Sequence, residues 1–185
     1  MTDDAPLHHR RTTRLSGWDY SADGAFFVTV CTSDRSHLFG EIADGHMRVN
    51  ALGAVVADSW RWLASQYTHV TLDDWCLMPN HLHGLLILTG RGGSRTAPTD
   101  TSTPSNDAVM TPRKPVGRLI GAFKTVSTKH INRLRNTPAA VVWQRNFWDH
   151  IVRDDREMDL IRAYIRDNPT NWSSDGLNDA AGVFL

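Results

Sequence analysis

A chain of 185 residues with 41% hydrophobic and 22% charged residues is typical of one globular domain, which excludes a wholly disordered or fibrous protein. Two cysteines are too few for a small fold built on disulfides. The formal net charge is zero, but residues 1–89 carry 6 basic and 10 acidic side chains, whereas residues 113–167 carry 12 basic and 6 acidic ones. The basic segment fits a polyanionic partner, and it also fits the solvated faces of ordinary helices.

The cysteines and the apolar runs bear on the cellular compartment. Cys31 and Cys76 both lie inside apolar runs, where small buried thiols are more common than a disulfide or a reactive pair. The sequence shows no secretory signal and no apolar stretch of 18 residues. We therefore expect a cytoplasmic, nucleoid-associated protein.

Strands dominate the first half of the predicted fold. Residues 1–16 lack periodicity and are expected to form a loose arm, and residues 25–32 form a β-branched and aromatic strand. Residues 47–50 follow an Asp44-Gly45 turn and are expected to pair with that strand. Asn50 can cap an amphipathic helix over residues 51–67, and residues 70–78 and 81–88 form two strands that meet at Pro79-Asn80.

Helices dominate the second half. The Gly, Ser, Thr and Pro content of residues 90–112 predicts a mobile insert, and a basic amphipathic helix is expected over residues 116–135. Residues 141–152 are expected to form a strand or an ordered loop. Asp154 and Glu157 form a helix start signal, and Pro169 ends that last helix at Asn168. We expect one domain over residues 1–175 and a tail from residue 176.

The first candidate site is the pair His81 and His83. In a strand, positions i and i+2 point to the same face, so both imidazoles can reach one ion. Two neutral ring nitrogens are a plausible half of a divalent-metal site. An H-x-H pair in a strand also occurs as two half-exposed histidines without a ligand.

The second candidate pair is Tyr164 and Asn168, which are one turn apart on the last helix. Tyrosine is a credible nucleophile when a cation stabilises its phenolate and the target is a polarised phosphodiester. The alternatives are a core-edge tyrosine and an amide that caps the end of the helix.

A third group combines cations with aromatic rings, a mixture that can neutralise phosphates and stack on bases. The alternative is that these side chains serve as helix surface and core. The candidate DNA-binding residues are Arg118, Lys124, Lys129, Arg133, Arg145, Arg153 and Trp148.

These motifs occur together in an order that resembles a known family. The segments FFVTVCT, HLFGEI, WCLMPNHLHGLLIL, LIGAFKTVSTKHIN, VWQRNFWDHIVRD and IRAYIRDNP are similar to those of the REP-associated tyrosine transposases. This family is related to the IS200/IS605 transposases of the HUH single-stranded DNA nuclease superfamily. The similarity extends from residue 18 to residue 172.

The resemblance implies an α+β, ferredoxin-like fold: an antiparallel sheet with helices packed mainly on one face. It implies that His81 and His83 hold Mg²⁺ or Mn²⁺, that Tyr164 attacks single-stranded DNA, and that Asn168 occupies the position of a further metal ligand. His150 is a reserve candidate for that ligand, and Tyr20 and Tyr67 are the competing tyrosines.

Three functions follow as alternatives. The first is a metal-dependent endonuclease and strand transferase that cleaves at hairpin-forming repeats through a covalent 5′-phosphotyrosine. The second is a domesticated, non-cleaving binder of structured single-stranded DNA, and the third is a metallohydrolase that activates water. The resemblance favours a monomer, and the sequence leaves a homodimer open.

Overall fold

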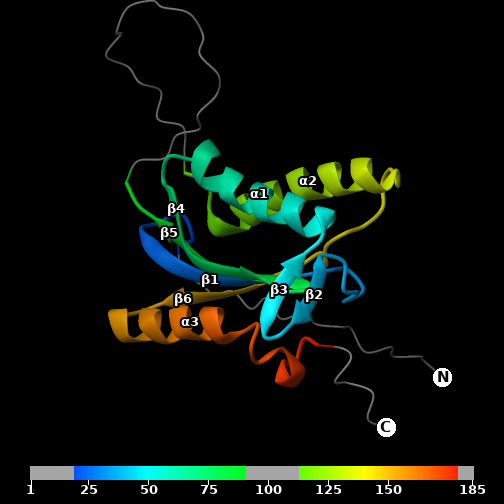
Figure 1. Ribbon diagram of the computed structural model, residues 1–185. Coiled ribbons are helices and arrows are strands. Elements are labelled where there is room, and N and C mark those ends of the chain that lie inside the picture. The colour runs from blue at the N-terminus through cyan, green and yellow to red at the C-terminus, as the bar shows by residue number, and fades with distance from the viewer. Residues whose placement is uncertain (1–18, 91–112, 179–185) are drawn as a thin grey trace, which may run out of the picture.

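The computed structural model describes residues 19–90 and 113–178. The predicted arm over residues 1–16 and all but the first residue of the predicted insert over residues 90–112 lie outside the described residues. Within the described ranges the strands and helices follow one another as Figure 1 shows. Their bounds are β1 Gly24–Cys31, β2 Gly40–Ala43, β3 His46–Val49, α1 Ala51–Gln66, β4 Val70–Leu77, β5 His81–Leu88, α2 Val116–Arg135, β6 Trp148–Val152, α3 Asp155–Asp167 and the short 3-10 helix Trp172–Ser174.

Four strands form an antiparallel sheet in the order β4-β5-β1-β6. Apart from the β2–β3 hairpin, the chain runs β1-α1-β4-β5-α2-β6, which with this strand order is the ferredoxin-like arrangement. α1 and α2 cover one face of the sheet, and the shorter α3 lies against the other (Figure 1). The predicted fold class is confirmed.

The alternation of side chains along the strands divides the interior into two cores. The larger core lies between the sheet and the helices α1 and α2, and it contains fully buried Phe26, Trp60 and Phe123. The smaller core lies under α3 and contains Phe27, Leu85 and Ile165. Strand residues on the smaller-core side therefore face α3, which is the face that carries the candidate site.

Local signals in the sequence fix where two of the helices begin. The side chain of Asn50 accepts the backbone N–H groups of Leu52 and Gly53 at the start of α1. The side chain of Asp154 accepts the N–H of Glu157 at the start of α3, as the D-x-x-E signal predicts.

None of the helices among the described residues combines the length and the apolar character that a membrane span requires.

The predicted partner of residues 47–50 is wrong. β3 pairs with β2 in a separate two-stranded sheet and not with β1. Asp44 and Gly45 both have positive φ angles, of 53° and 72°, which suits a two-residue hairpin turn between adjacent segments. Both edges of β1 are already occupied, by β5 and by β6.

Gly84 allows α1 to approach the strand that carries the two histidines. A Cβ atom at Gly84 would lie 2.4 Å from the Cζ2 atom of the fully buried Trp60 ring. The side chain of Trp60 is enclosed and the strand is central, so neither can move aside without disturbing the core.

Gly84→Ala is therefore expected to lower the free energy of unfolding by about 1–3 kcal/mol, measured by urea denaturation. Gly121→Ala is the matched control, because Gly121 lies exposed in α2 and a Cβ atom at this position would meet no other element within 4 Å. The control should gain about 0.5–1 kcal/mol from helix propensity. Equal stability of Gly84→Ala and the wild type would contradict the packing described for Trp60.

Candidate active site and metal-binding residues

His81 and His83 lie at the start of β5 and point to the α3 side of the sheet, as their spacing predicts. Their Nε2 atoms are 3.0 Å apart, and the residues are 0% and 2% exposed. The Nδ1 atom of His83 is 2.8 Å from the hydroxyl oxygen of Thr29 on the neighbouring strand β1. The pair is therefore buried and rigidly placed, which differs from the half-exposed alternative.

Asn80 sets the proton position on His81. The amide nitrogen of Asn80 donates to the backbone carbonyls of Arg35 and Leu177, at 3.0 and 2.7 Å. The amide oxygen therefore faces the Nδ1 atom of His81, at 2.8 Å, and accepts its proton. A neutral His81 then keeps an unprotonated Nε2, which is the form that binds metal. The sequence pattern gave no indication of this role of Asn80.

Burial keeps both imidazoles neutral. Desolvation lowers the pKa of His81 from 6.5 to about 3. Desolvation, followed by repulsion from His81, lowers the pKa of His83 to about 3 as well. Protons therefore do not compete with a metal for these nitrogens at neutral pH.

The same shifts predict how stability depends on pH. An unfolded imidazole takes up a proton near pH 6.5, whereas the native pair does so only near pH 3, so stability is full above pH 6.5 and is lost as the pH falls. In EDTA, each imidazole should make the free energy of unfolding rise by about 1.4 kcal/mol per pH unit between about pH 3 and pH 6.5. His83→Gln should reduce the slope of urea-measured stability against pH by about that amount. An unchanged slope would contradict the neutral, buried state of His83.

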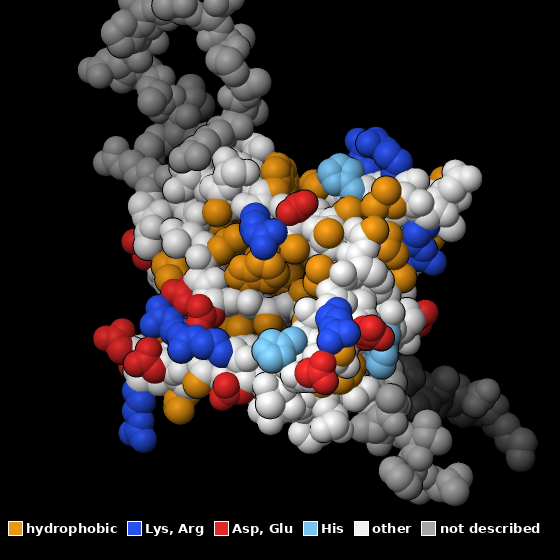
Figure 2. Space-filling view, viewed as in Figure 1, with side chains coloured by type: hydrophobic (Ala, Val, Ile, Leu, Met, Phe, Trp, Pro, Cys, Tyr) orange, Lys and Arg blue, Asp and Glu red, His pale blue; other side chains and the backbone are white. Residues whose placement is uncertain are grey.

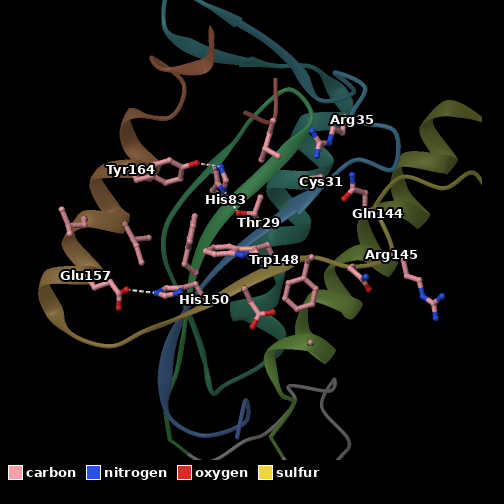
Figure 3. Close-up of a pocket in the computed structure, with 18 residues that line it drawn as sticks. Thr29, Cys31, Arg35, His83, Gln144, Arg145, Trp148, His150, Glu157 and Tyr164 are labelled. Atoms are coloured by element: carbon pink, nitrogen blue, oxygen red, sulfur yellow. Dashed lines mark hydrogen bonds and ion pairs between the residues drawn. The ribbon is translucent and has the colours of Figure 1, made fainter. Parts of the chain in front are cut away.

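Tyr164 projects from α3 towards His83 (Figure 3). Its hydroxyl oxygen is 3.3 Å from the Nε2 atom of His83, and its ring packs edge-on against Phe27 at a centroid distance of 5.9 Å. The side chain remains 47% exposed, so it can meet a ligand in the cleft. Desolvation, with a contribution from the charge of Asp175, raises the pKa of Tyr164, whereas its hydrogen bond with Asn168 opposes that rise.

Two ion pairs hold α3 against the edge of the sheet. Arg162 donates two hydrogen bonds to Asp73, at 2.9 and 2.7 Å, and Arg166 donates to Asp74 at 2.7 Å. The two aspartates occupy the irregular step of β4 between Leu72 and Trp75. Figure 2 shows acidic and basic side chains gathered over α3 and the adjoining edge of the sheet. These contacts fix the position of Tyr164 relative to the histidines of the same chain.

Asn168 and Asp175 place further oxygen atoms near the site. Asn168, directly after α3, is 4% exposed, and its Oδ1 atom is buried without a hydrogen-bond partner. The Oδ2 atom of Asp175 is also buried without such a partner, and it is 3.7 Å from the Nε2 atom of His81. The sequence did not single out Asp175, because no motif spacing connects it to the histidines.

The donor set fits a divalent cation. Among the described residues, His81, His83 and Asp175 offer ligand atoms that all lie within 4.8 Å of one another. Two ligand atoms that bind one ion at a right angle, each about 2.1 Å from it, are about 3.0 Å from each other. The Nε2 atoms of His81 and His83 are also 3.0 Å apart, so their spacing suits two ligands of one ion. His150 is not in this group; its Nε2 atom instead lies 2.7 Å from a carboxylate oxygen of Glu157.

A cleft of about 1290 Å³ opens beside Tyr164 and His83. Trp148 and Leu160 line it and are 45% and 64% exposed, which is unusual for large apolar side chains. The Trp148 ring lies parallel to His150 at a centroid distance of 5.8 Å (Figure 3). The same ring is edge-on to Phe27. The cleft therefore presents a fixed aromatic surface next to the tyrosine.

A second groove, of about 840 Å³, continues from this cleft. Lys129 and Arg133 of α2 line it, and Arg145 lines both the groove and the cleft. Arg118 and Arg153, also predicted to bind DNA, are exposed but line neither hollow.

Lys124, also predicted to bind DNA, lines the same groove as Lys129 and Arg133, but its ammonium group is engaged by the protein. Its ammonium group donates to the backbone carbonyls of Gln144 and Asn146, at 2.8 and 2.9 Å. Desolvation lowers its pKa to about 8. Lys124 therefore anchors the segment before β6 and has little capacity left for a phosphate.

Cys31 and Cys76 form no disulfide with each other, and both are partly buried. Burial raises the pKa of the Cys76 thiol to about 12, so this thiol stays protonated and is a poor nucleophile or metal ligand.

The chain is 33% identical over 177 residues to an uncharacterized protein of Haemophilus influenzae, and the match covers 94% of this chain and 95% of the relative. The chain belongs to the family of that protein. It is also 24% identical over 160 residues to a Haemophilus influenzae protein named "Putative REP-associated tyrosine transposase", with 82% of this chain and 73% of the relative covered. The resemblance to REP-associated tyrosine transposases that the motifs indicate is confirmed. No protein-family model matches the chain.

Two solved structures of transposases show a limited likeness to the chain. One is a REP-associated tyrosine transposase bound to a REP hairpin, with 17% identity, a TM-score of 0.49 and coverage of 93% of this chain and 89% of that one. The other is described as a "putative transposase" from Deinococcus radiodurans, with 16% identity, a TM-score of 0.42 and coverage of 83% and 95%.

Proposed function

We propose that the protein is a metal-dependent single-stranded DNA endonuclease and strand transferase that acts at hairpin-forming repeats. The observation that carries the proposal is the distance of 3.3 Å between the hydroxyl oxygen of Tyr164 and the Nε2 atom of His83. It joins a tyrosine in an open cleft to a buried pair of neutral imidazoles, although the two residues are 81 positions apart in the sequence.

In this proposal His81, His83 and Asn168 hold Mg²⁺ or Mn²⁺. The unpartnered Oδ1 atom of Asn168 supports its assignment as a ligand over a role as a helix cap. The bound cation would polarise the phosphodiester and offset the charge of the phenolate. Burial of Tyr164 raises its pKa, so the free enzyme keeps the phenol protonated, and the amide of Asn168 is placed to stabilise the phenolate.

Tyr164 then attacks the phosphorus of the scissile phosphodiester. The phenol releases its proton to water as a bond forms between its oxygen and phosphorus, the bond to the 3′ oxygen breaks, and the leaving 3′ oxygen takes up a proton, so that no proton is gained or lost overall. The product is a 5′-phosphotyrosine and a free 3′ hydroxyl. Because the intermediate retains the phosphodiester energy, attack by another 3′ hydroxyl can rejoin DNA without ATP.

The two connected hollows support DNA as the substrate. Trp148 offers a surface on which an unpaired base can stack, and Lys129, Arg133 and Arg145 supply positive charge along the adjoining groove. The proposed DNA-binding residues also include the exposed Arg118 and Arg153. They do not include Lys124, because its ammonium group donates to backbone carbonyls. The similarity to a relative named as a REP-associated tyrosine transposase supports repeat DNA as the partner.

We further propose that one chain forms the whole site, so that a monomer is active. Tyr164 and both histidines meet within a single chain, and Arg162 and Arg166 secure α3 to its own sheet. The proposed setting is the cytoplasm, where such DNA is found.

The experiment is denaturing gel electrophoresis of the purified protein with labelled single-stranded DNA that carries a hairpin repeat from beside its own gene. A slow-migrating adduct is expected with Mn²⁺ and is not expected with EDTA or with the fully double-stranded form. Cleavage without an adduct would favour water activation. Tight binding without cleavage would favour the non-cleaving DNA binder.

A further inference from the structure

A buried carboxylate oxygen at the histidine pair lacks a donor. The Oδ1 atom of Asp175 accepts the backbone N–H of Leu177 at 2.8 Å, but its Oδ2 atom has no hydrogen-bond partner. The side chain is 8% exposed, and Oδ2 lies 3.7 Å from the Nε2 atom of the fully buried His81. Burial of an ionised oxygen without a donor or a cation is costly, so this arrangement needs a partner.

His81 cannot supply that partner in its neutral form. Its one ring proton is on Nδ1 and is directed to the Asn80 oxygen, at 2.8 Å. Its Nε2 atom therefore presents a lone pair towards Asp175 and towards the Nε2 atom of His83. With the proton of neutral His83 on Nδ1, where the hydroxyl oxygen of Thr29 accepts it at 2.8 Å, the Nε2 atom of His83 also presents a lone pair. In this state the ligand atoms of His81, His83 and Asp175 lie within 4.8 Å of one another, and a bound cation satisfies all of them at once.

The segment that carries Asp175 is fastened over the histidines. We call residues 172–178 the C-terminal strap. The Trp172 ring lies 6.0 Å from the ring of His81 and 5.3 Å from that of His37. The carbonyl of Leu177 accepts from Asn80, at 2.7 Å, so the strap also touches the residue that orients His81. Residues 176–178, assigned to a tail from the sequence, are thus part of the enclosure of the site.

We propose that Asp175 is a ligand of the divalent cation bound by His81 and His83, and that this bond ties the C-terminal strap to β5. The inference rests on the proposed metal site but not on DNA cleavage. A carboxylate oxygen makes the donor set harder, which favours Mg²⁺ and Mn²⁺ over ions that prefer nitrogen and sulfur. The strap closes the His81 side of the site, and the cleft beside Tyr164 stays open to substrate.

The test is Mn²⁺ binding by the full chain without DNA, measured by isothermal titration and by electron paramagnetic resonance of free Mn²⁺. Asp175→Asn keeps the shape of the side chain and the oxygen that accepts from Leu177, so the strap can retain its turn. Its affinity for Mn²⁺ is expected to fall by at least about tenfold. Glu41→Gln, which removes an exposed carboxylate from the β2–β3 hairpin, is the matched control and should bind Mn²⁺ like the wild type.

Thermal unfolding in EDTA is a second measurement, in which Asp175→Asn is expected to be at least as stable as the wild type although it binds Mn²⁺ less tightly. Asp175→Asn removes an unpaired buried charge, so its Tm without metal should equal or exceed that of the wild type, and its rise in Tm with Mn²⁺ should be smaller.

Wild-type affinity for Mn²⁺ in Asp175→Asn, or no Mn²⁺ binding by the wild type, would overturn the inference. A lower Tm of Asp175→Asn in EDTA would also overturn it, because the carboxylate would then have a structural partner. If Mn²⁺ binding depends on Asp175 but no protein–DNA adduct forms, the inference stands and the proposed cleavage fails.

Discussion

Tyr164→Phe is expected to reduce formation of the covalent protein–DNA adduct by at least about 10³-fold, because it removes the only atom of this side chain that can bond to phosphorus. The phenyl ring keeps its edge-on packing against Phe27, so the fold and the affinity for DNA should change little. The adduct is measured on a denaturing gel over a time course, and affinity is measured by fluorescence anisotropy with the same labelled hairpin.

Tyr67→Phe is the matched control for this variant. Tyr67 is 4% exposed, and its hydroxyl accepts a hydrogen bond from Lys114 at 3.2 Å, so it is not available to DNA. The control should form the adduct at the wild-type rate. Retention of the adduct in Tyr164→Phe would exclude Tyr164 as the nucleophile.

His83→Ala should abolish Mn²⁺ binding and lower the rate of adduct formation by at least about 100-fold. His83 lies between the other parts of the site, with its Nε2 atom 3.0 Å from His81 and 3.3 Å from Tyr164. Its removal would therefore take away one proposed metal ligand and one neighbour of the proposed nucleophile. Mn²⁺ binding is measured by isothermal titration, and the adduct is measured on a denaturing gel.

His69→Gln controls for the loss of a buried histidine. His69 is 2% exposed, and burial also lowers its pKa, but its ring contacts the Lys114 carbonyl and not the site. This variant should lose some stability and keep wild-type Mn²⁺ affinity. If His83→Ala bound Mn²⁺ as tightly as the wild type, the histidine pair would not be the metal site.

Periodicity was sufficient to predict the local parts of the site. The i and i+2 spacing of His81 and His83 put both rings on one face of β5, and the i and i+4 spacing placed Tyr164 and Asn168 one turn apart. The ferredoxin-like sheet was implied by the resemblance to the family, and the predicted order of helices and strands is compatible with it. The spacing of the site residues depends on neighbouring residues in the sequence, which is why it could be interpreted without a structure.

The rest depends on contacts between segments that are distant in the sequence. No local pattern indicates that Asp175 lies near His81, or that the Asn80 amide bridges Arg35 and Leu177. Lys124 has the sequence character of a DNA-binding residue, but its ammonium group binds backbone carbonyls. The pairing of β3 was mistaken because a strand pattern does not identify its partner when a short, nearby strand competes for it.

The central claim is that DNA becomes bonded to Tyr164, and peptide mapping of the adduct tests it most directly. The adduct formed with Mn²⁺ would be digested with nuclease and trypsin, and the peptides would be sequenced by tandem mass spectrometry. Trypsin cleaves after Arg162 and Arg166, so Tyr164 lies in the short peptide Ala-Tyr-Ile-Arg. We predict a nucleotide phosphate on the tyrosine of this peptide. A nucleotide on a peptide that contains Tyr20 or Tyr67, with the Ala-Tyr-Ile-Arg peptide unmodified, would contradict the proposed mechanism.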